Sequence, residues 1–306
     1  MTTAIARTDT DDALPLRTAG LPVAQEVPVN DDAFLAYWLE CQRSPHTKAA
    51  YRVSAERFRR FAGKPLYAVT RRDLLRFERA LAEEGMAPRS VRVTMARVKA
   101  LLSFAEEQGY TSFNVGRAHR LPRPQNRLAE RILTEAQVLQ ILALETNPRN
   151  QAILKVLYYS AVRVSELCGL RWRDCLEREG GAGQVTVQGK GGKTRAILLP
   201  PVAWEALVAC RQSPEEDAPV FPSPRKPSVP LTRRAILNIV RAASLRAGID
   251  KPVSPHFFRH SHATHALDRQ APIHLVSATL GHSSLATTGQ YAHVRPGESS
   301  GRYLIR

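Results

Sequence analysis

The chain has 306 residues, enough for one large domain or two ordinary ones, and its hydrophobic content of 43% is typical of a globular protein. No stretch approaches the roughly 18 uncharged apolar residues of a membrane span, and Asp9, Asp11 and Asp12 stand where a signal peptide needs an apolar block. The four cysteines form no Cys-x-x-Cys pair, which excludes a disulfide framework or a zinc ribbon. We expect a soluble cytoplasmic protein.

The charge is strongly positive, with 44 Lys and Arg against 28 Asp and Glu, a net of +16. The surplus begins after residue 42: residues 1–42 carry 2 basic and 7 acidic side chains, whereas residues 43–120 carry 17 and 7. Two interpretations are open. Either the basic residues form a surface that binds along a phosphate backbone, or they form a solvated arginine-rich surface that reflects coding bias.

Residues 1–28 are rich in Thr, Asp and Pro and predict a flexible tail. Residues 29–113 predict a helical domain, because apolar side chains recur at helical spacing over four segments. At 100° per residue, cations of the second segment fall within about 40° and those of the fourth within about 80°. Such clustering also occurs by chance, but we predict that these cations bind DNA. They are Lys48, Arg52 and Arg59 on the second segment and Arg89, Arg92 and Lys99 on the fourth.

Residues 114–130 contain two prolines and several arginines, and they predict a basic linker in which Arg123 and Arg127 also contact DNA. Residues 131–306 predict a second domain. Its β-rich runs, residues 184–188 and 194–199, flank a glycine-rich turn and predict a hairpin, and helical patterns dominate the rest. The expected fold class is therefore mainly α with a small β-sheet.

Two motifs in the second domain are misleading. Gly192-Lys193-Thr194 resembles part of a phosphate-binding loop, but Val187 stands where the first glycine is required, and a strand follows instead of a helix. His256 and His260 share a helix face, yet the glutamate of His-Glu-x-x-His is absent and no cysteine is near. We expect neither ATP binding nor a metal site.

Six residues form an ordered set that suits chemistry on a phosphodiester: Arg163, Lys190, His256, Arg259, His282 and Tyr291. Two guanidinium groups can hold and neutralise a phosphate without a metal. A tyrosine hydroxyl can attack phosphorus if a base or nearby cations favour the phenolate, and Lys190 can protonate the departing 5′ oxygen. The two histidines can bond the phosphate or carry protons. Each residue alone also has an ordinary structural explanation, and only the set favours catalysis.

The local motifs of this set resemble those of the tyrosine recombinases of the phage-integrase and Xer type. The similar segments are Ala161-Val-Arg-Val-Ser-Glu-Leu167, Gly189-Lys-Gly191, Ser254-Pro-His-Phe-Phe-Arg-His260, Leu280-Gly-His-Ser-Ser284 and Tyr291-Ala-His293. The resemblance covers about residues 30–293. It implies an N-terminal four-helix, SAM-like core-binding domain over residues 29–113 and a catalytic domain over residues 131–306.

The resemblance also implies a reaction and its partners. Tyr291 forms a 3′-phosphotyrosyl link, which a 5′-hydroxyl of the partner duplex then attacks, so no cofactor is needed. The partners are DNA with inverted-repeat half-sites and further copies of the chain, a dimer on one site and a tetramer at synapsis, with or without a second recombinase. Two alternatives stay open at this point: a topoisomerase-like relaxing enzyme, and a DNA-binding regulator with a relict active site.

Overall fold

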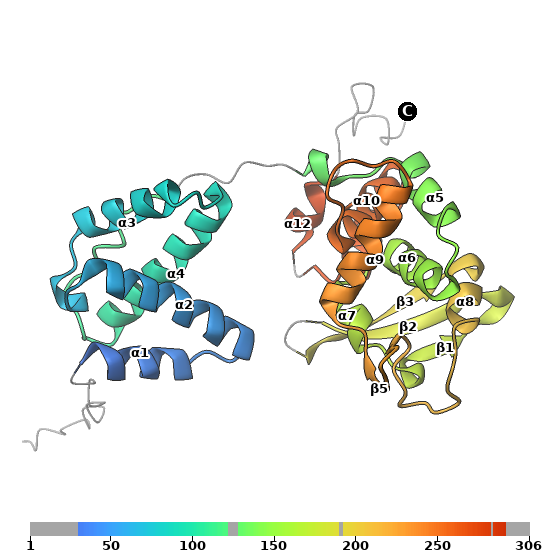
Figure 1. The fold of residues 1–306 in the computed structure, drawn as a ribbon, viewed down its shortest axis with the longest axis horizontal. Helices are drawn as coiled ribbons and strands as arrows, with labels where there is room; N and C mark the ends of the chain where they lie inside the picture. The colour runs from blue at the N-terminus through green and yellow to red at the C-terminus, as the bar shows by residue number, and fades with distance from the viewer. Residues whose placement is uncertain (1–29, 122–127, 190–191, 283, 292–306) are drawn as a thin grey trace, which may run out of the picture. The chain divides into compact units, whose positions relative to one another are not determined.

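The computed structural model describes residues 30–121, 128–189, 192–282 and 284–291. These residues form two compact units, divided between Gln125 and Asn126 (Figure 1). The first unit is helical, and the second combines helices with a small sheet. The expected fold class, mainly α with a small sheet, is confirmed. In the described residues, no helix is both long enough and apolar enough to cross a membrane.

The first unit packs four helices around an aromatic and aliphatic core. Phe34, Phe58, Phe77 and Met95 are fully buried there, one from each helix. The helix ends follow local chemistry: Thr70 and Asp73 form a capping box before the third helix, and Gly63 ends the second at a positive φ of 62°. The helices are α1 (Asp31–Glu40), α2 (Pro45–Ala62), α3 (Arg71–Glu83) and α4 (Pro88–Glu107).

The segment that follows α4 differs from the linker expected over residues 114–130. Asn114 and His119 are buried, and Leu121 packs against the core of the first unit. Asn114 accepts a hydrogen bond from the Gly116 backbone at 2.8 Å. The first half of the expected linker therefore belongs to the helical unit, because its few apolar and amide side chains find partners there. Arg123 and Arg127 lie outside the described residues.

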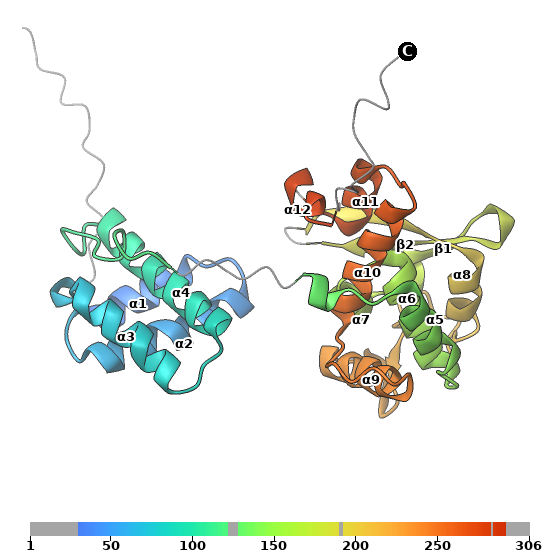
Figure 2. The same ribbon diagram turned by 90° about the horizontal axis from the view of Figure 1, so that it is seen from above.

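The second unit surrounds α6, whose contacts include α5, α8, α9, α10 and the sheet. Its helices are α5 (Glu135–Ala143), α6 (Pro148–Ser160), α7 (Val164–Gly169), α8 (Pro201–Val208), α9 (Arg233–Arg246), α10 (Pro255–Asp268), α11 (Ile273–Leu280) and α12 (Leu285–Gly289). Figure 2 shows α11 and α12 side by side near α10. This grouping matters because α10 carries His256 and Arg259, and because His282 and Tyr291 come just after α11 and α12.

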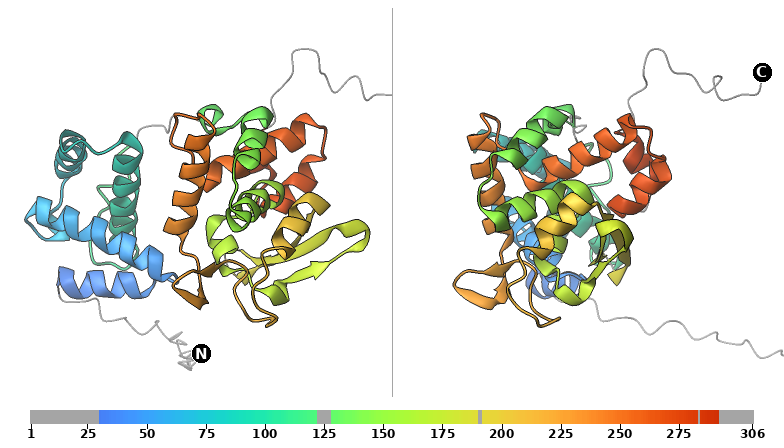
Figure 3. Two further views of the ribbon diagram at one scale, coloured as in Figure 1. Left: turned by 45° about the vertical axis from the view of Figure 1, so that its right-hand side comes forward. Right: turned by 90° about the vertical axis from the view of Figure 1, so that its right-hand side faces the viewer.

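The antiparallel sheet has the order β1-β2-β3, with β1 (Cys175–Glu177), β2 (Gly183–Gln188) and β3 (Thr194–Leu199) (Figure 3). Val185 pairs with Ile197, and both side chains are buried in the core of the unit. The antiparallel pairing of β2 with β3 confirms the hairpin predicted from the two β-rich runs, and buried residues alternate with more exposed ones along both strands.

Three short strands were not predicted. β1 has only three residues, too few for alternation to show. The other two form a separate pair, β4 (Pro222–Ser223) and β5 (Lys226–Pro230). Pro227 and Pro230 within β5 argue against a strand from sequence alone, because proline cannot donate a ladder hydrogen bond. Such a pair is possible at the edge of a structure, where that donor is not needed.

A tight turn joins α6 to α7 and sets the position of the predicted arginine motif. Ala161, fully buried, caps α6 with a left-handed φ of 51°, a conformation that alanine seldom adopts. Two residues later, Arg163 is the N-cap of α7 in an extended conformation. Ala161 belongs to a small buried apolar cluster that also contains Ala263, Leu280 and Tyr291.

Candidate active site

Arg163 is held at the start of α7 by Glu166, three residues further on. The Arg163 backbone nitrogen donates to Glu166 Oε2 at 2.8 Å, and its guanidinium Nη1 donates to Oε1 at 2.9 Å. The Glu166 side chain is buried, whereas a third of the Arg163 side chain is exposed. The guanidinium is therefore fixed at one edge and open to a ligand at the other.

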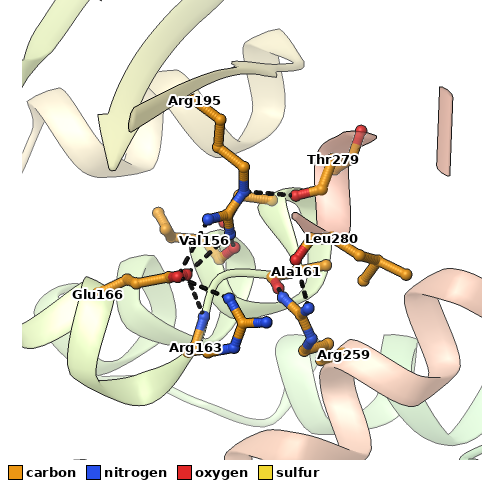
Figure 4. Close-up of polar contacts among 9 residues, drawn as sticks. Val156, Ala161, Arg163, Glu166, Arg195, Arg259, Thr279 and Leu280 are labelled. Atoms are coloured by element: carbon orange, nitrogen blue, oxygen red, sulfur yellow. Dashed lines mark hydrogen bonds and ion pairs between the residues drawn. The ribbon is translucent and has the colours of Figure 1, made fainter. Parts of the chain in front are cut away.

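A second arginine, Arg195 on β3, grips the same carboxylate. Its Nη1 and Nη2 donate to Glu166 Oε1 and Oε2 at 3.0 and 2.8 Å, and its Nε donates to the Thr279 carbonyl at 2.8 Å (Figure 4). Burial opposes the ionisation of Glu166, but hydrogen bonds from Arg195 and then from Arg163 outweigh it and lower the pKa of this carboxyl group. Glu166 is a carboxylate at neutral pH.

Arg259 on α10 is almost completely buried and is bound by two backbone carbonyls. Its Nη1 donates to Ala161 at 2.5 Å, and its Nη2 donates to Leu280. Burial first, and then the positive charge of Arg163, lower the pKa of Arg259 to about 10. The group remains charged at neutral pH, and it ties the α6–α7 turn to the end of α11 (Figure 4). Arg163 and Arg259 therefore present two fixed positive charges to one place.

Tyr291 is buried just after α12, with its hydroxyl bonded to α10. The distance from Tyr291 Oη to His260 Nδ1 is 2.7 Å. The ring of His282 lies nearly parallel to that of Tyr291, with centroids 6.5 Å apart, and His282 Nδ1 is 2.9 Å from the Thr288 hydroxyl. Burial raises the pKa of the Tyr291 hydroxyl, although Arg259 opposes this. The phenol is therefore protonated at neutral pH and needs a base to become a nucleophile.

The neighbouring histidines are neutral at pH 7. Burial lowers the pKa of His260 to about 4, helped by His256, Arg131, Arg259 and His282. Burial, and then the positive charges of Arg259, Arg163 and Arg195, lower the pKa of His282 to about 4. The pKa of His256 is lowered by desolvation and then by Arg259 and Arg163. The rings therefore carry no charge in the resting site, and each neutral imidazole has a free lone pair that can accept a hydrogen bond or a proton.

The structure brings five of the six predicted residues into one cluster. His256 lies beside the others, since its ring centroid is 6.2 Å from that of His260. Lys190, which stands between β2 and β3 in the sequence, lies outside the described residues. The described part of the chain contains no group of three or more His, Cys, Asp or Glu side chains arranged to hold a metal ion.

Sequence reasoning missed three residues that hold the cluster together: Glu166, Arg195 and His260. The Arg163-x-x-Glu166 spacing at a helix start is a capping-box signal, so Glu166 was accessible to local reasoning. His260 was considered only as a metal ligand. Arg195 is 29 residues from Glu166 in the sequence, and no local pattern predicts that contact.

The cations predicted to bind DNA differ in how the first unit holds them. Arg52 and Arg89 are exposed, and Lys48 and Arg92 are partly buried.

Two of these predicted side chains have partners within the unit. Arg59 donates to Asp32 at 2.6 Å and lies 3.7 Å from Asp31. Lys99 donates to the His119 carbonyl. Helical periodicity placed both residues on a polar face, but it gave no sign of these contacts, which compete with a phosphate for the same donors.

Comparisons with known proteins agree over most of the chain. Residues 131–298 match the phage integrase family, and residues 32–109 match the N-terminal SAM-like domain of phage integrases. Tyrosine recombinase XerC of Xanthomonas campestris pv. campestris (strain B100) is 30% identical over 272 residues, 86% of this chain and 83% of that protein. Tyrosine recombinase XerC of Methylobacterium sp. (strain 4-46) is 34% identical over 288 residues, 85% and 88% of the two chains.

Solved structures share the fold. The XerH site-specific recombinase bound to its difH substrate in a pre-cleavage complex superposes with a TM-score of 0.67 at 20% identity, covering 86% of this chain and 81% of that one. A lambda integrase dimer bound to a COC′ core site gives a TM-score of 0.69 at 20% identity, covering 89% and 79%. At these identities, the superpositions support the architecture alone.

Proposed function

This chain belongs to the phage integrase family, the tyrosine recombinases, and is a site-specific enzyme that cleaves and rejoins DNA; for its mechanism, we propose that Tyr291 is the nucleophile and that Arg163 and Arg259 hold the scissile phosphate. The observation that supports these roles most strongly is that one helix, α10, both carries Arg259 and bonds the Tyr291 hydroxyl through His260. Helix α10 therefore positions both the attacking oxygen and one arginine of the pair that holds the phosphate.

The two arginines act by charge. In phosphoryl transfer, negative charge lies on the non-bridging oxygens, and fixed donors stabilise it without reorganising. The Arg259 guanidinium is fixed by the carbonyls of Ala161 and Leu280, and the Arg163 guanidinium is fixed by Glu166. Both forks therefore meet the phosphate already oriented.

Cleavage then forms the bond between Tyr291 Oη and phosphorus and breaks the bond to the 5′ oxygen. The phenolic proton passes to His260 Nδ1, which is neutral and already within hydrogen-bond distance. Lys190 donates the proton that the departing 5′ oxygen requires. The product is a 3′-phosphotyrosyl link and a free 5′-hydroxyl. Attack by the 5′-hydroxyl of a partner strand reverses these transfers and rejoins the DNA.

We place the enzyme in the cytoplasm, on inverted-repeat half-sites, acting as a dimer on one site and a tetramer at synapsis. The structural relatives support an assembly of this kind, since one is a lambda integrase dimer on a core site and another is a lambda integrase tetramer bound to a Holliday junction. The basic faces of α2 and α4 suit the DNA backbone.

The test is covalent trapping on DNA. The recognised site is first selected from duplexes with two randomised inverted half-sites, and a nick is then placed beside the scissile position so that the released fragment diffuses away. The wild-type protein is expected to accumulate a covalent adduct, and the Tyr291→Phe variant to bind the same duplex without forming one. An adduct from Tyr291→Phe would refute the assignment of the nucleophile.

A further inference from the structure

Arg195 lies where three parts of the proposed site meet. It donates two hydrogen bonds to the Glu166 carboxylate, which also holds Arg163. Through Nε it binds the Thr279 carbonyl, and a Cβ atom on Gly281 would come within 3.1 Å of its Nη1, so its guanidinium packs against the residue before His282. A Cβ on Gly189, the residue before Lys190, would lie 3.6 Å from the same atom.

The side chain is itself unsuited to binding a phosphate. It is only 13% exposed, and three of its N–H groups are already directed at Glu166 and Thr279. The contact with Glu166 is bidentate, the geometry in which arginine binds a carboxylate most strongly and most specifically. A lysine cannot reproduce it, because an ammonium group is a point charge without a planar fork.

The charge balance gives Arg195 a second role. Glu166 alone would largely neutralise Arg163, the group that must stabilise the phosphate. With Arg195 present, three guanidinium groups (Arg163, Arg195 and Arg259) face one carboxylate, so the cluster keeps a net formal charge of +2 instead of +1. Arg195 thus shares the carboxylate and leaves more of the Arg163 charge available to a ligand.

We infer that Arg195 is a positioning residue of the recombination reaction, which orients Arg163 through Glu166 while its guanidinium packs against Gly281. This inference rests on the proposed function, because it acts through the residues assigned there. It extends that proposal to a side chain that does not touch the DNA.

The experiment compares Arg195→Gln with the wild type in single-turnover cleavage of the nicked duplex. We expect cleavage to slow by about tenfold to a hundredfold, the range for residues that orient a functional group, at unchanged DNA affinity. Arg195→Lys keeps the charge but loses the fork, so its rate is expected between the two. Arg178→Gln is the matched control: Arg178 is an exposed arginine next to the same sheet that donates to neutral Gln184, and its loss is expected to leave the rate unchanged.

A modified substrate separates positioning from simple loss of structure. A methylphosphonate at the scissile position has lost the negative charge that Arg163 stabilises. The Arg195→Gln variant should therefore cleave this substrate within about threefold of the wild-type rate. The corresponding difference in activation free energy is smaller than that of a tenfold change in rate. A partly unfolded variant would be slow on both substrates. Equal slowing on the two linkages, or no slowing on either, would overturn the inference.

The double variant Arg195→Gln, Glu166→Gln completes the test. Removing Arg195 leaves the Glu166 carboxylate paired with Arg163 alone, and the amide removes that neutralising charge. The double variant should therefore cleave faster than Arg195→Gln, whereas two independent defects would multiply. If the wild type cleaves, Tyr291→Phe does not, and Arg195→Gln matches the wild type, only this inference fails. An adduct from Tyr291→Phe refutes the proposed function itself.

Discussion

The hydroxyl of Tyr291 and Nδ1 of His260 lie 2.7 Å apart, although 31 residues separate them in the sequence. Burial raises the pKa of the tyrosine and lowers the pKa of the histidine to about 4. The pair is therefore a neutral phenol beside a neutral imidazole at pH 7. This is the ground state that a proton transfer coupled to nucleophilic attack requires.

Replacing His260 by Ala should slow cleavage by about 10²- to 10⁴-fold, the range for loss of a positioned base. The defect should shrink at high pH, because hydroxide then ionises the phenol without help. The measurement is single-turnover cleavage between pH 6 and pH 10. His274→Ala, which changes an exposed histidine on α11, is the control and should leave the profile unchanged. A defect of the same size at every pH would contradict the assignment of His260 as the proton acceptor.

Replacing Arg259 by Ala should remove about 3–4 kcal/mol of transition-state stabilisation, which is several hundredfold in the cleavage rate. It should also lower the melting temperature, since the buried carbonyls of Ala161 and Leu280 lose their donor at about 1–3 kcal/mol each. Arg269→Ala is the comparison variant. Arg269 is exposed beyond the end of the same helix and pairs with Glu135 in a solvent-screened contact, so its loss should leave both the cleavage rate and the melting temperature nearly unchanged. Similar rates for the two variants would count against the clamp.

The melting temperature of the chain should fall as the pH is lowered from about 6.5 to about 4. Folding depresses the pKa values of four histidines, so in this range the unfolded chain binds more protons than the folded one, and stability is lost with decreasing pH. The carboxylates with lowered pKa values, such as Glu166, lose their contribution only at lower pH. His260→Asn should make the fall shallower. An unchanged slope would contradict the protonation states assigned here. The four histidines are His256, His260, His262 and His282.

Arg52 and Arg89, the two exposed cations predicted to bind DNA, should contribute more to DNA affinity than Arg59, which forms an ion pair. Arg52→Ala and Arg89→Ala should each weaken binding and reduce the slope of log affinity against log salt by about one. Arg59 is bound to Asp32, so Arg59→Ala should change the salt slope less and the stability of the first unit more. Fluorescence anisotropy at several salt concentrations measures the slopes. Arg117→Ala, outside the predicted face, is the control; an equal effect from it would remove the case for a specific surface.

Sequence reasoning succeeded where the signal was local. Periodicity located α2 and α4, and the Thr70–Asp73 capping box located the start of α3. It failed for contacts between distant segments: the packing of Asn114 and His119 onto the first unit, and the grip of Arg195 on Glu166. Such contacts depend on the tertiary fold and leave no spacing in the sequence. The described members of the predicted set could be found in the sequence because the motifs that carry them are short.

Peptide mapping of the trapped DNA adduct tests the central claim most directly. After nuclease and protease digestion of the wild-type adduct, mass spectrometry should find a single nucleotide-bearing peptide, modified at Tyr291 through a 3′-phosphate. A nucleotide on a serine or on another tyrosine, or a 5′-phosphate linkage, would contradict the account.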